Sequence, residues 1–348
     1  MLLQVLPASL IATWVAVACS PLLISSEPIA HVDLYGVRNV PEEVVHRALG
    51  VGPGDDIGFD RDAAKARLRA LPEIEDAKII LMPMPGNAIV LVGIEEVGAV
   101  QLRLDSAPTG EVRLPGAFVD LYEGILELSL EAIYAGQSRE DCADGFALSV
   151  YEPLREKELE LADLAQQHAG LLPKVLRESS DATHRAIAAT SIAALRDKQV
   201  VQEALARAMR DPDPGVRNNA TRALLVLSDW ANDVEEFAVK IDVEPAIEML
   251  ESITWTDRNK AAGLLFHLSE QRNPILLATL RERSVPALAE MARWSSEGHS
   301  YTSRMLLGRV AGLKEPELQA AEASLSGSER AAWIDRLVEL CSDPQATE

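Results

Sequence analysis

Histidine is the side chain best suited to acid–base and metal chemistry near neutral pH, and the sequence holds six: His31, His46, His168, His184, His267 and His299. None lies in H-E-x-x-H or in another spacing that puts two ligands on one helix face. His184 and His267 lie in segments with helical periodicity, where a solvent-facing or hydrogen-bonded imidazole is the commoner case. The histidines therefore predict no metal site.

The other chemical motifs lead to the same result. No G-x-S-x-G occurs, which argues against a hydrolase elbow. Gly50, Gly52 and Gly54 form G-x-G-x-G, but between two expected helices rather than after a strand, so they are no dinucleotide fingerprint. The tryptophans recur among helices, where packing is their usual role. We expect no catalytic residues, no cofactor and no enzymatic activity.

Three cysteines remain to be assigned. Cys19 belongs to an apolar leader, and Cys142 and Cys341 lie in the remainder of the chain. The sequence lacks C-x-x-C, so zinc and thioredoxin-like sites have no support. An exported protein could join Cys142 to Cys341 in a disulfide. Two buried free thiols are the expectation that we favour.

Residues 1–28 read as a leader, because 1–25 contain no Lys, Arg, Asp or Glu. Ala16, Val17 and Ala18 fit the small-x-small cleavage signature of a secretory signal. Cys19 follows them and resembles the lipidated cysteine of a lipoprotein, although Ala16 replaces the usual larger aliphatic residue. No basic residue precedes the apolar run, so the true start codon stays open. Three fates of the leader stay open, namely cleavage, lipidation or retention as an anchor, and each places the protein in the periplasm or envelope.

Composition narrows the class of partner. A formal net charge of −21 argues against nucleic acid and anionic lipid surfaces as partners, because both require clustered Lys and Arg. We therefore expect membrane association only through the leader or a lipid. A chain of 348 residues predicts two or three domains. Aromatic residues make up only 4%, so alanine and leucine do most of the packing, as in closely packed helices.

Residues 29–97 change periodicity in an informative order. Residues 29–35 alternate as a half-buried strand does, and Pro41 followed by two glutamates opens a helix. Asp60 is a candidate N-cap for a second helix, which Pro72 ends. Residues 77–82 and 88–94 are β-rich runs joined by a proline- and glycine-containing turn. The predicted order is β-α-α-β-β.

This α+β pattern resembles a POTRA domain, the polypeptide-transport-associated module. The resemblance rests on V-D-L-Y-G-V-R-N-V-P-E-E, V-G-P-G-D, A-R-L-R-A-L-P-E-I-E-D-A-K-I and I-V-L-V-G-I-E-E. It implies that the final strand is central and that the preceding one forms a sheet edge, where a partner strand could add. The predicted partner-binding residues are Lys78, Ile79, Ile80, Leu81 and Met82.

The sequence from residue 98 to 170 changes character twice. Residues 98–116 are polar and punctuated by proline and glycine, and they read as a linker, at most with one short strand. Residues 117–170 read as a helical region with helices over 117–136, 138–149 and 156–167. No segment beyond the linker predicts a strand.

Residues 171–342 repeat a helix pair, and 343–348 form a tail. Arg185 begins an eleven-residue run that recurs at Arg217 and Arg258. The segment A-M-R-D-P-D-P-G-V-R-N-N-A-T-R-A-L-L resembles a HEAT repeat, which implies an all-α solenoid of stacked pairs. In such repeats a turn aspartate and a second-helix arginine tie neighbours together. Asp181 with Arg185, and Asp213 with Arg217, are the expected structural pairs.

Together these features favour a non-enzymatic scaffold of the cell envelope that docks or handles other envelope proteins or unfolded polypeptides. One alternative is a division-type scaffold held in the inner membrane by an uncleaved leader. Another is an enzyme of the HEAT-like lyase type, which rests on the repeat alone, and a fold does not imply a function. The sequence does not name the partner or the oligomeric state.

Overall fold

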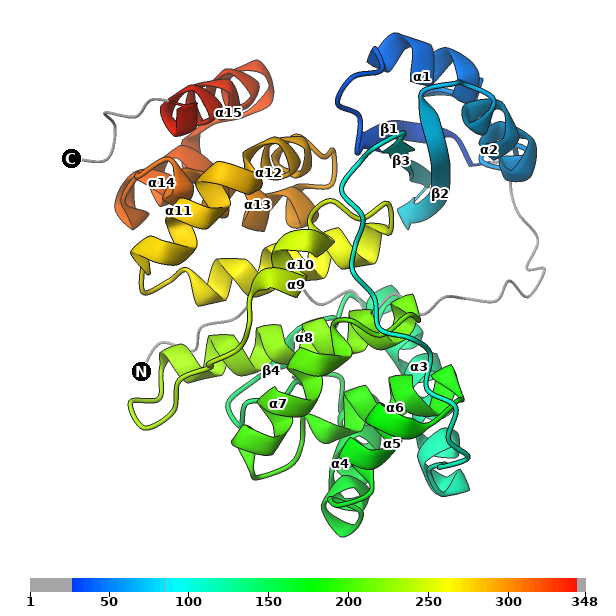
Figure 1. Ribbon diagram of the computed structural model, residues 1–348, viewed down its shortest axis with the longest axis vertical. Helices are drawn as coiled ribbons and strands as arrows, with labels where there is room; N and C mark the ends of the chain where they lie inside the picture. The colour runs from blue at the N-terminus through cyan, green and yellow to red at the C-terminus, as the bar shows by residue number, and fades with distance from the viewer. Residues whose placement is uncertain (1–26, 85, 343–348) are drawn as a thin grey trace. The chain divides into compact units, whose positions relative to one another are not determined.

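The computed structural model describes residues 27–84 and 86–342 (Figure 1). The expected cleavage site at Ala18, the lipidation candidate Cys19 and the tail 343–348 lie outside these residues. The described chain divides into two compact units. One unit consists of Arg103–Ala246 and Gly263–Gln271, and the other of residues 27–102, Ile247–Ala262 and 272–342.

The second unit begins with a small sheet domain. Its elements are β1 (Ile29–Tyr35), α1 (Glu42–Leu49), α2 (Arg61–Arg69), β2 (Ile74–Met84) and β3 (Asn87–Glu96). The order β-α-α-β-β is the expected one, and both later strands are longer than expected. The strands lie in the order β1-β3-β2, with β1 parallel and β2 antiparallel to the central β3. The sheet therefore ends at β2, the strand expected at an edge.

Local chemistry explains the two helices of this domain. Asp60 caps α2 by accepting from the amide of Ala63, and Gly50 ends α1 in the left-handed conformation. Both helices cover one face of the sheet (Figure 1). Their buried side chains Val45, Leu49, Ala64 and Leu68 share a core with Val90 and Val92 of β3. Burial of these aliphatic groups is the main stabilising contribution to the domain.

The other unit begins with the segment that was predicted to be a linker. Residues 103–115 contain no helix, but hydrogen bonds fix them to the helices of this unit. Gly110 forms an isolated β-bridge with Ser179, and the amide of Asp105 donates to the carbonyl of Arg210 over 2.8 Å. Then follow α3 (Gly116–Tyr134), β4 (Glu140–Asp141), β5 (Leu148–Ser149) and α4 (Glu152–Gln167). The helix predicted over 138–149 was wrong, since β4 and β5 form an antiparallel hairpin there. The expectation of no further strand was wrong for the same reason.

Helix pairs fill the rest of this unit. They are α5 (Leu172–Glu178) with α6 (Ala182–Ile192), and α7 (Lys198–Ala208) with α8 (Pro214–Asn232). The first helices α5 and α7 contact each other, as do the second helices α6 and α8. This stacking buries the apolar faces that one pair alone would leave in water.

The chain continues through α9 (Glu244–Met249), α10 (Trp255–Leu268), α11 (Pro274–Arg283), α12 (Val285–Ala292), α13 (Glu297–Val310), α14 (Glu315–Ser324) and α15 (Gly327–Ser342). In the second unit, α13 packs against α11, α12 and α15. No helix within the described residues combines the length and apolarity that a membrane span requires. Cys142 and Cys341 are free thiols, and burial raises the pKa of each, to about 12 and about 11.

Candidate functional site

The predicted partner-binding residues lie on β2, the last strand of the sheet. In the described chain this strand has one ladder partner, β3, with Ile80 opposite Leu91 and Met82 opposite Ile89. Lys78, Ile79, Ile80 and Leu81 are half-buried, and Met82 is only 2% exposed. One edge of β2 therefore faces away from the sheet, although its side chains are not freely exposed.

The face of the sheet that α1 and α2 leave uncovered is not open to a partner. Lys78 donates from Nζ to Oγ1 of Thr254 over 2.6 Å. A Cβ placed on Gly93 of β3 would lie 2.6 Å from the carbonyl oxygen of Ile253. Residues of the loop between α9 and α10 thus cover this face within the same unit. Binding along the strand edge stays a prediction, but binding across this face at Lys78 is excluded.

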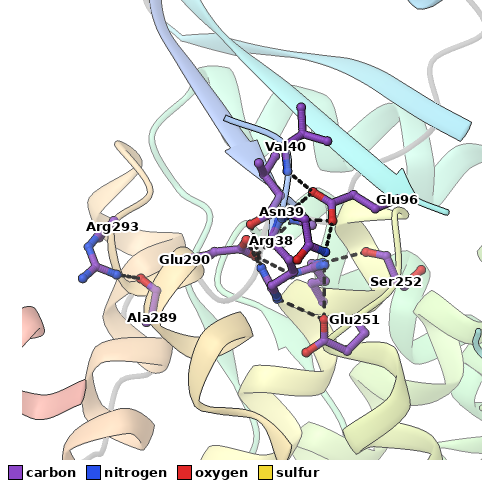
Figure 2. A network of polar contacts seen from close by, with 12 residues as sticks. Arg38, Asn39, Val40, Glu96, Glu251, Ser252, Ala289, Glu290 and Arg293 are labelled. Atoms are coloured by element: carbon purple, nitrogen blue, oxygen red, sulfur yellow. Dashed lines mark hydrogen bonds and ion pairs between the residues drawn. The ribbon is translucent and has the colours of Figure 1, made fainter. Parts of the chain in front are cut away.

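A polar clamp holds the loop after β1 to the helices of the same unit (Figure 2). We define the clamp as Arg38, Glu251, Arg258 and Glu290. Arg38 pairs with Glu290 and, over 3.0 Å, with Glu251. Arg258 donates to Glu290 over 3.0 Å, and the amide of Gly36 donates to the same carboxylate over 3.1 Å. The carboxylate of Glu290 on α12 thus contacts both the loop after β1 and the helix α10.

Burial and charge act against each other within the clamp. Arg258 is fully buried, and this burial lowers the pKa of its guanidinium, although Glu290 and Glu251 oppose the shift. At Arg38, burial also lowers the pKa, but here Glu290 and Glu251 outweigh it and the net shift is upward. Both guanidinium groups remain charged, because arginine is not deprotonated in proteins. Loss of Glu290 would remove the carboxylate that hydrogen-bonds to the fully buried Arg258.

Glu96, the last residue of β3, orders the same loop from the other side (Figure 2). Its carboxylate accepts hydrogen bonds from the amides of Arg38, Asn39 and Val40 over 2.8 to 3.0 Å. Burial alone would raise the pKa of Glu96, but these amides outweigh it, so the pKa lies below its ordinary value. The loop is therefore held in one conformation before it meets Glu290.

Aromatic groups complete the contact between the sheet domain and the helices. Tyr35 is fully buried, and its hydroxyl donates to the carbonyl of Ile253 over 3.1 Å. Its ring meets that of Trp294 edge-on, with 5.8 Å between centroids. Asp33 accepts from the amide and the hydroxyl of Ser295. These contacts mark a fixed interface rather than a catalytic centre.

The repeat arginines Arg185, Arg217 and Arg258 are buried, and their partners differ from the expected aspartates. Arg185 pairs with Asp211 rather than Asp181, and its two nitrogens reach the carboxylate over 2.7 and 2.8 Å. Arg217 donates to the backbone carbonyls of Asp211 and Pro212. Arg258 reaches Glu290 of α12, as described above.

The two predicted aspartates have a different role. Asp181 and Asp213 are N-caps, accepting from amides of the first turns of α6 and α8. Sequence reasoning missed Asp211, Glu96 and Glu290. Asp211 precedes a recognised turn, so its place next to a repeat boundary was a usable signal. No local sequence motif distinguishes Glu96 or Glu290 from the solvent-exposed glutamates of the chain.

No described group of His, Cys, Asp and Glu side chains could hold a metal ion. His299 is buried and stacks edge-on against Trp255, and burial lowers its pKa to about 3. It is therefore a neutral core residue at physiological pH. The contacts around the clamp position the sheet domain against the helices of the same unit.

Comparison with known proteins identifies the helical part. A family model described as HEAT repeats matches residues 171–262, which covers α5 through much of α10. Among solved structures, the designed armadillo repeat protein YIII(Dq)4CqI aligns at 15% identity, over 55% of this chain and 94% of its own, with a TM-score of 0.36. No curated protein matches the chain. Residues 171–262 are therefore similar to HEAT repeats, helix pairs that stack as a solenoid, a fold typical of protein-interaction scaffolds.

Proposed function

We propose that this protein is an exported, non-enzymatic scaffold with a POTRA-like sheet domain that binds an extended segment of another polypeptide along β2. The observation that carries the proposal is the strand order β1-β3-β2, which leaves an eleven-residue strand at the end of the sheet. A strand added there would gain main-chain hydrogen bonds for affinity and side-chain contacts for selectivity.

The character of the edge supports this use. Exposed edges are commonly blunted by charges or prolines within the strand. In β2 the central run 77–82 carries one charge, at Lys78, and that side chain is engaged by Thr254. The proline at position 83 and the exposed Met84 come only at the end of the strand. An incoming segment would therefore meet mostly aliphatic neighbours at Ile79, Ile80 and Leu81.

The clamp and the solenoid support a scaffold. The clamp fixes the sheet domain to the helices of its unit, so a segment bound at β2 would be held relative to α12. The export part of the proposal rests on the uncharged leader, and the partner would then be an envelope protein or an unfolded polypeptide. The net charge of −21 favours partners that carry basic residues.

The test begins with a photo-crosslinker at Glu75, an exposed residue of β2, in the full-length protein within its native envelope. A crosslinker at Glu43, exposed on α1, is the matched control. The segment captured at Glu75 but not at Glu43 is then synthesised, and its affinity for the purified protein is measured. Capture alone does not decide the matter, because a neighbour in the envelope can crosslink without binding.

Two proline variants decide it. Neighbouring amides in a strand point to opposite edges, so one of Ile79 and Ile80 donates toward β3 and the other away from the sheet. Proline at the outward position removes an edge donor and should weaken binding at least about tenfold, with little change in circular dichroism. Proline at the inward position should lower the melting temperature instead. Full affinity in both folded variants would contradict strand addition.

A further inference from the structure

A separate polar cavity lies inside the unit formed by Arg103–Ala246 and Gly263–Gln271. Its volume is about 90 Å³, and its walls come from α3, α4, α6, α8 and the β4–β5 hairpin. Its lining includes the aliphatic side chains of Ile125, Leu126 and Leu161 and the charged side chains of Glu140, Glu158 and Arg222. At about 10–15 Å³ for each water-sized sphere, the space suits a molecule of roughly six heavy atoms.

The charged side chains that line the cavity do not balance one another. Arg222 donates to Glu140, and both side chains are largely buried, with 18% and 8% exposed. Glu158 accepts from the amide of Ser149 over 2.6 Å, but it makes no ion pair within the described part of the chain. One guanidinium thus faces two carboxylates.

The pKa of Glu158 reflects this imbalance. Burial raises it to about 7, the repulsion of Glu140 adds to the shift, and the Ser149 amide and the more distant Arg222 and Arg155 oppose it. Arg155 is already engaged with Asp141 over 3.2 Å. Among the groups that face Glu158 from β4, α4 and α8, none is therefore a free cation.

We propose that this cavity binds a small alkylammonium ion, with the ammonium at Glu158 and the alkyl chain among Ile125, Leu126 and Leu161. An ammonium would supply the missing positive charge and donate up to three hydrogen bonds. The three aliphatic side chains would shelter the alkyl group of the ligand from water. The net charge of −21 raises the local concentration of cations around the protein.

A carboxylate ligand is the competing occupant, because the buried Nε of Arg222 has no acceptor within the described residues. Such a ligand would add a third negative charge beside Glu140 and Glu158. The same alkylammonium chemistry could come from a free amine or from the side chain of a lysine in another polypeptide. The experiment separates these cases.

Isothermal titration of the full-length protein with n-butylammonium provides the direct test. Binding requires ionised Glu158, whose pKa is about 7, so the affinity should fall about tenfold from pH 8 to pH 6. Glu158→Gln should abolish binding. Glu160→Gln is the matched control, because Glu160 is exposed on the same helix and pairs with Lys157 on the surface. Butyrate and n-butanol serve as anionic and neutral probes.

The outcomes are distinct. Saturable binding of n-butylammonium that is lost in Glu158→Gln but kept in Glu160→Gln supports the proposal. Tighter binding of butyrate, equal binding by Glu158→Gln, or no saturable binding of any probe overturns it. If Glu158→Gln fails to fold, the pH dependence and the charge preference of the unmodified protein decide alone. Nα-acetyl-lysine amide binding as tightly as n-butylammonium identifies a lysine side chain as an occupant, and its exclusion identifies a free amine.

Discussion

Buried arginines on the second helices of the repeats act as struts that hold turns and neighbouring helices together. Arg185, Arg217 and Arg258 recur in the sequence, and Arg304 of α13 joins them by pairing with Glu322 over 2.6 Å. All four are buried. A guanidinium is well suited to this place, because its five donors can satisfy carboxylates and carbonyls at once while its charge never titrates.

The first prediction concerns one of these struts. Arg217→Ala should lower the free energy of unfolding by about 1–3 kcal/mol, because the carbonyls of Asp211 and Pro212 lose a buried donor. Chemical denaturation of the full-length protein provides the measurement. Arg207→Ala, at an exposed position on α7, is the control and should change stability by less than about 0.5 kcal/mol. Equal stability of the two variants would show that Arg217 is no strut.

Sequence reasoning singled out Arg185, Arg217 and Arg258, because recurrence at fixed positions is a local signal. It did not predict the partners of these arginines, because helix N-capping and ion pairing compete for the same aspartate carboxylates. Asp181 and Asp213 each come directly before a helix, where the first-turn amides capture the carboxylate. Asp211 is two residues further back and remains available to Arg185. Only the three-dimensional path of the turn decides between them.

The hairpin of β4 and β5 shows a similar limit for elements. Residues 138–149 have apolar residues at spacings that fit a helix. The turn Asp144–Gly145 instead favours a hairpin, and Gly145 has a φ of +72°. A Cβ there would lie 3.0 Å from the ring of Trp230 on α8. The hairpin was therefore signalled by one dipeptide, while the β-α-α-β-β order was signalled by several turns in sequence. Glu140 and Glu158 come together only because this hairpin forms.

The second prediction compares a glycine in the loop after β1, Gly36, with a glycine inside the helix α3, Gly124. Gly36, at the end of β1, has a φ of +78°, and a Cβ would lie 2.1 Å from the carbonyl oxygen of Ile94. Gly36→Ala should therefore destabilise the protein by at least about 1–3 kcal/mol through strain in the loop that presents Arg38. Gly124, within α3, has no atom near its Cβ position, so Gly124→Ala should stabilise by about 0.5–1 kcal/mol.

Thermal melting of both variants measures the two effects. The same added methyl group should shift the midpoint in opposite directions. Two shifts of the same sign would contradict the role given to the loop after β1.

At the scale of the whole molecule, the expected export depends on the leader, which lies outside the described residues. Ala16, Val17 and Ala18 predict cleavage after Ala18, since small residues at these positions fit a signal peptidase site. Intact mass of the protein purified from the envelope measures the new terminus. An added diacylglycerol mass at Cys19 would identify the lipidated form, and a terminus at Met1 would contradict cleavage.

The interface around Tyr35 has a consequence for the timing of synthesis. The strands of the sheet domain are complete once residue 97 has been made, but Ile253, Glu290 and Trp294 follow more than 150 residues later. At about 5–20 residues per second, the ribosome needs roughly 10–40 s to supply them. Throughout that interval the nascent domain carries Tyr35 and Arg38 without the helix residues that cover them. A chaperone that shields these residues during elongation would raise the yield of native protein, and a message truncated before codon 250 would give an aggregating product.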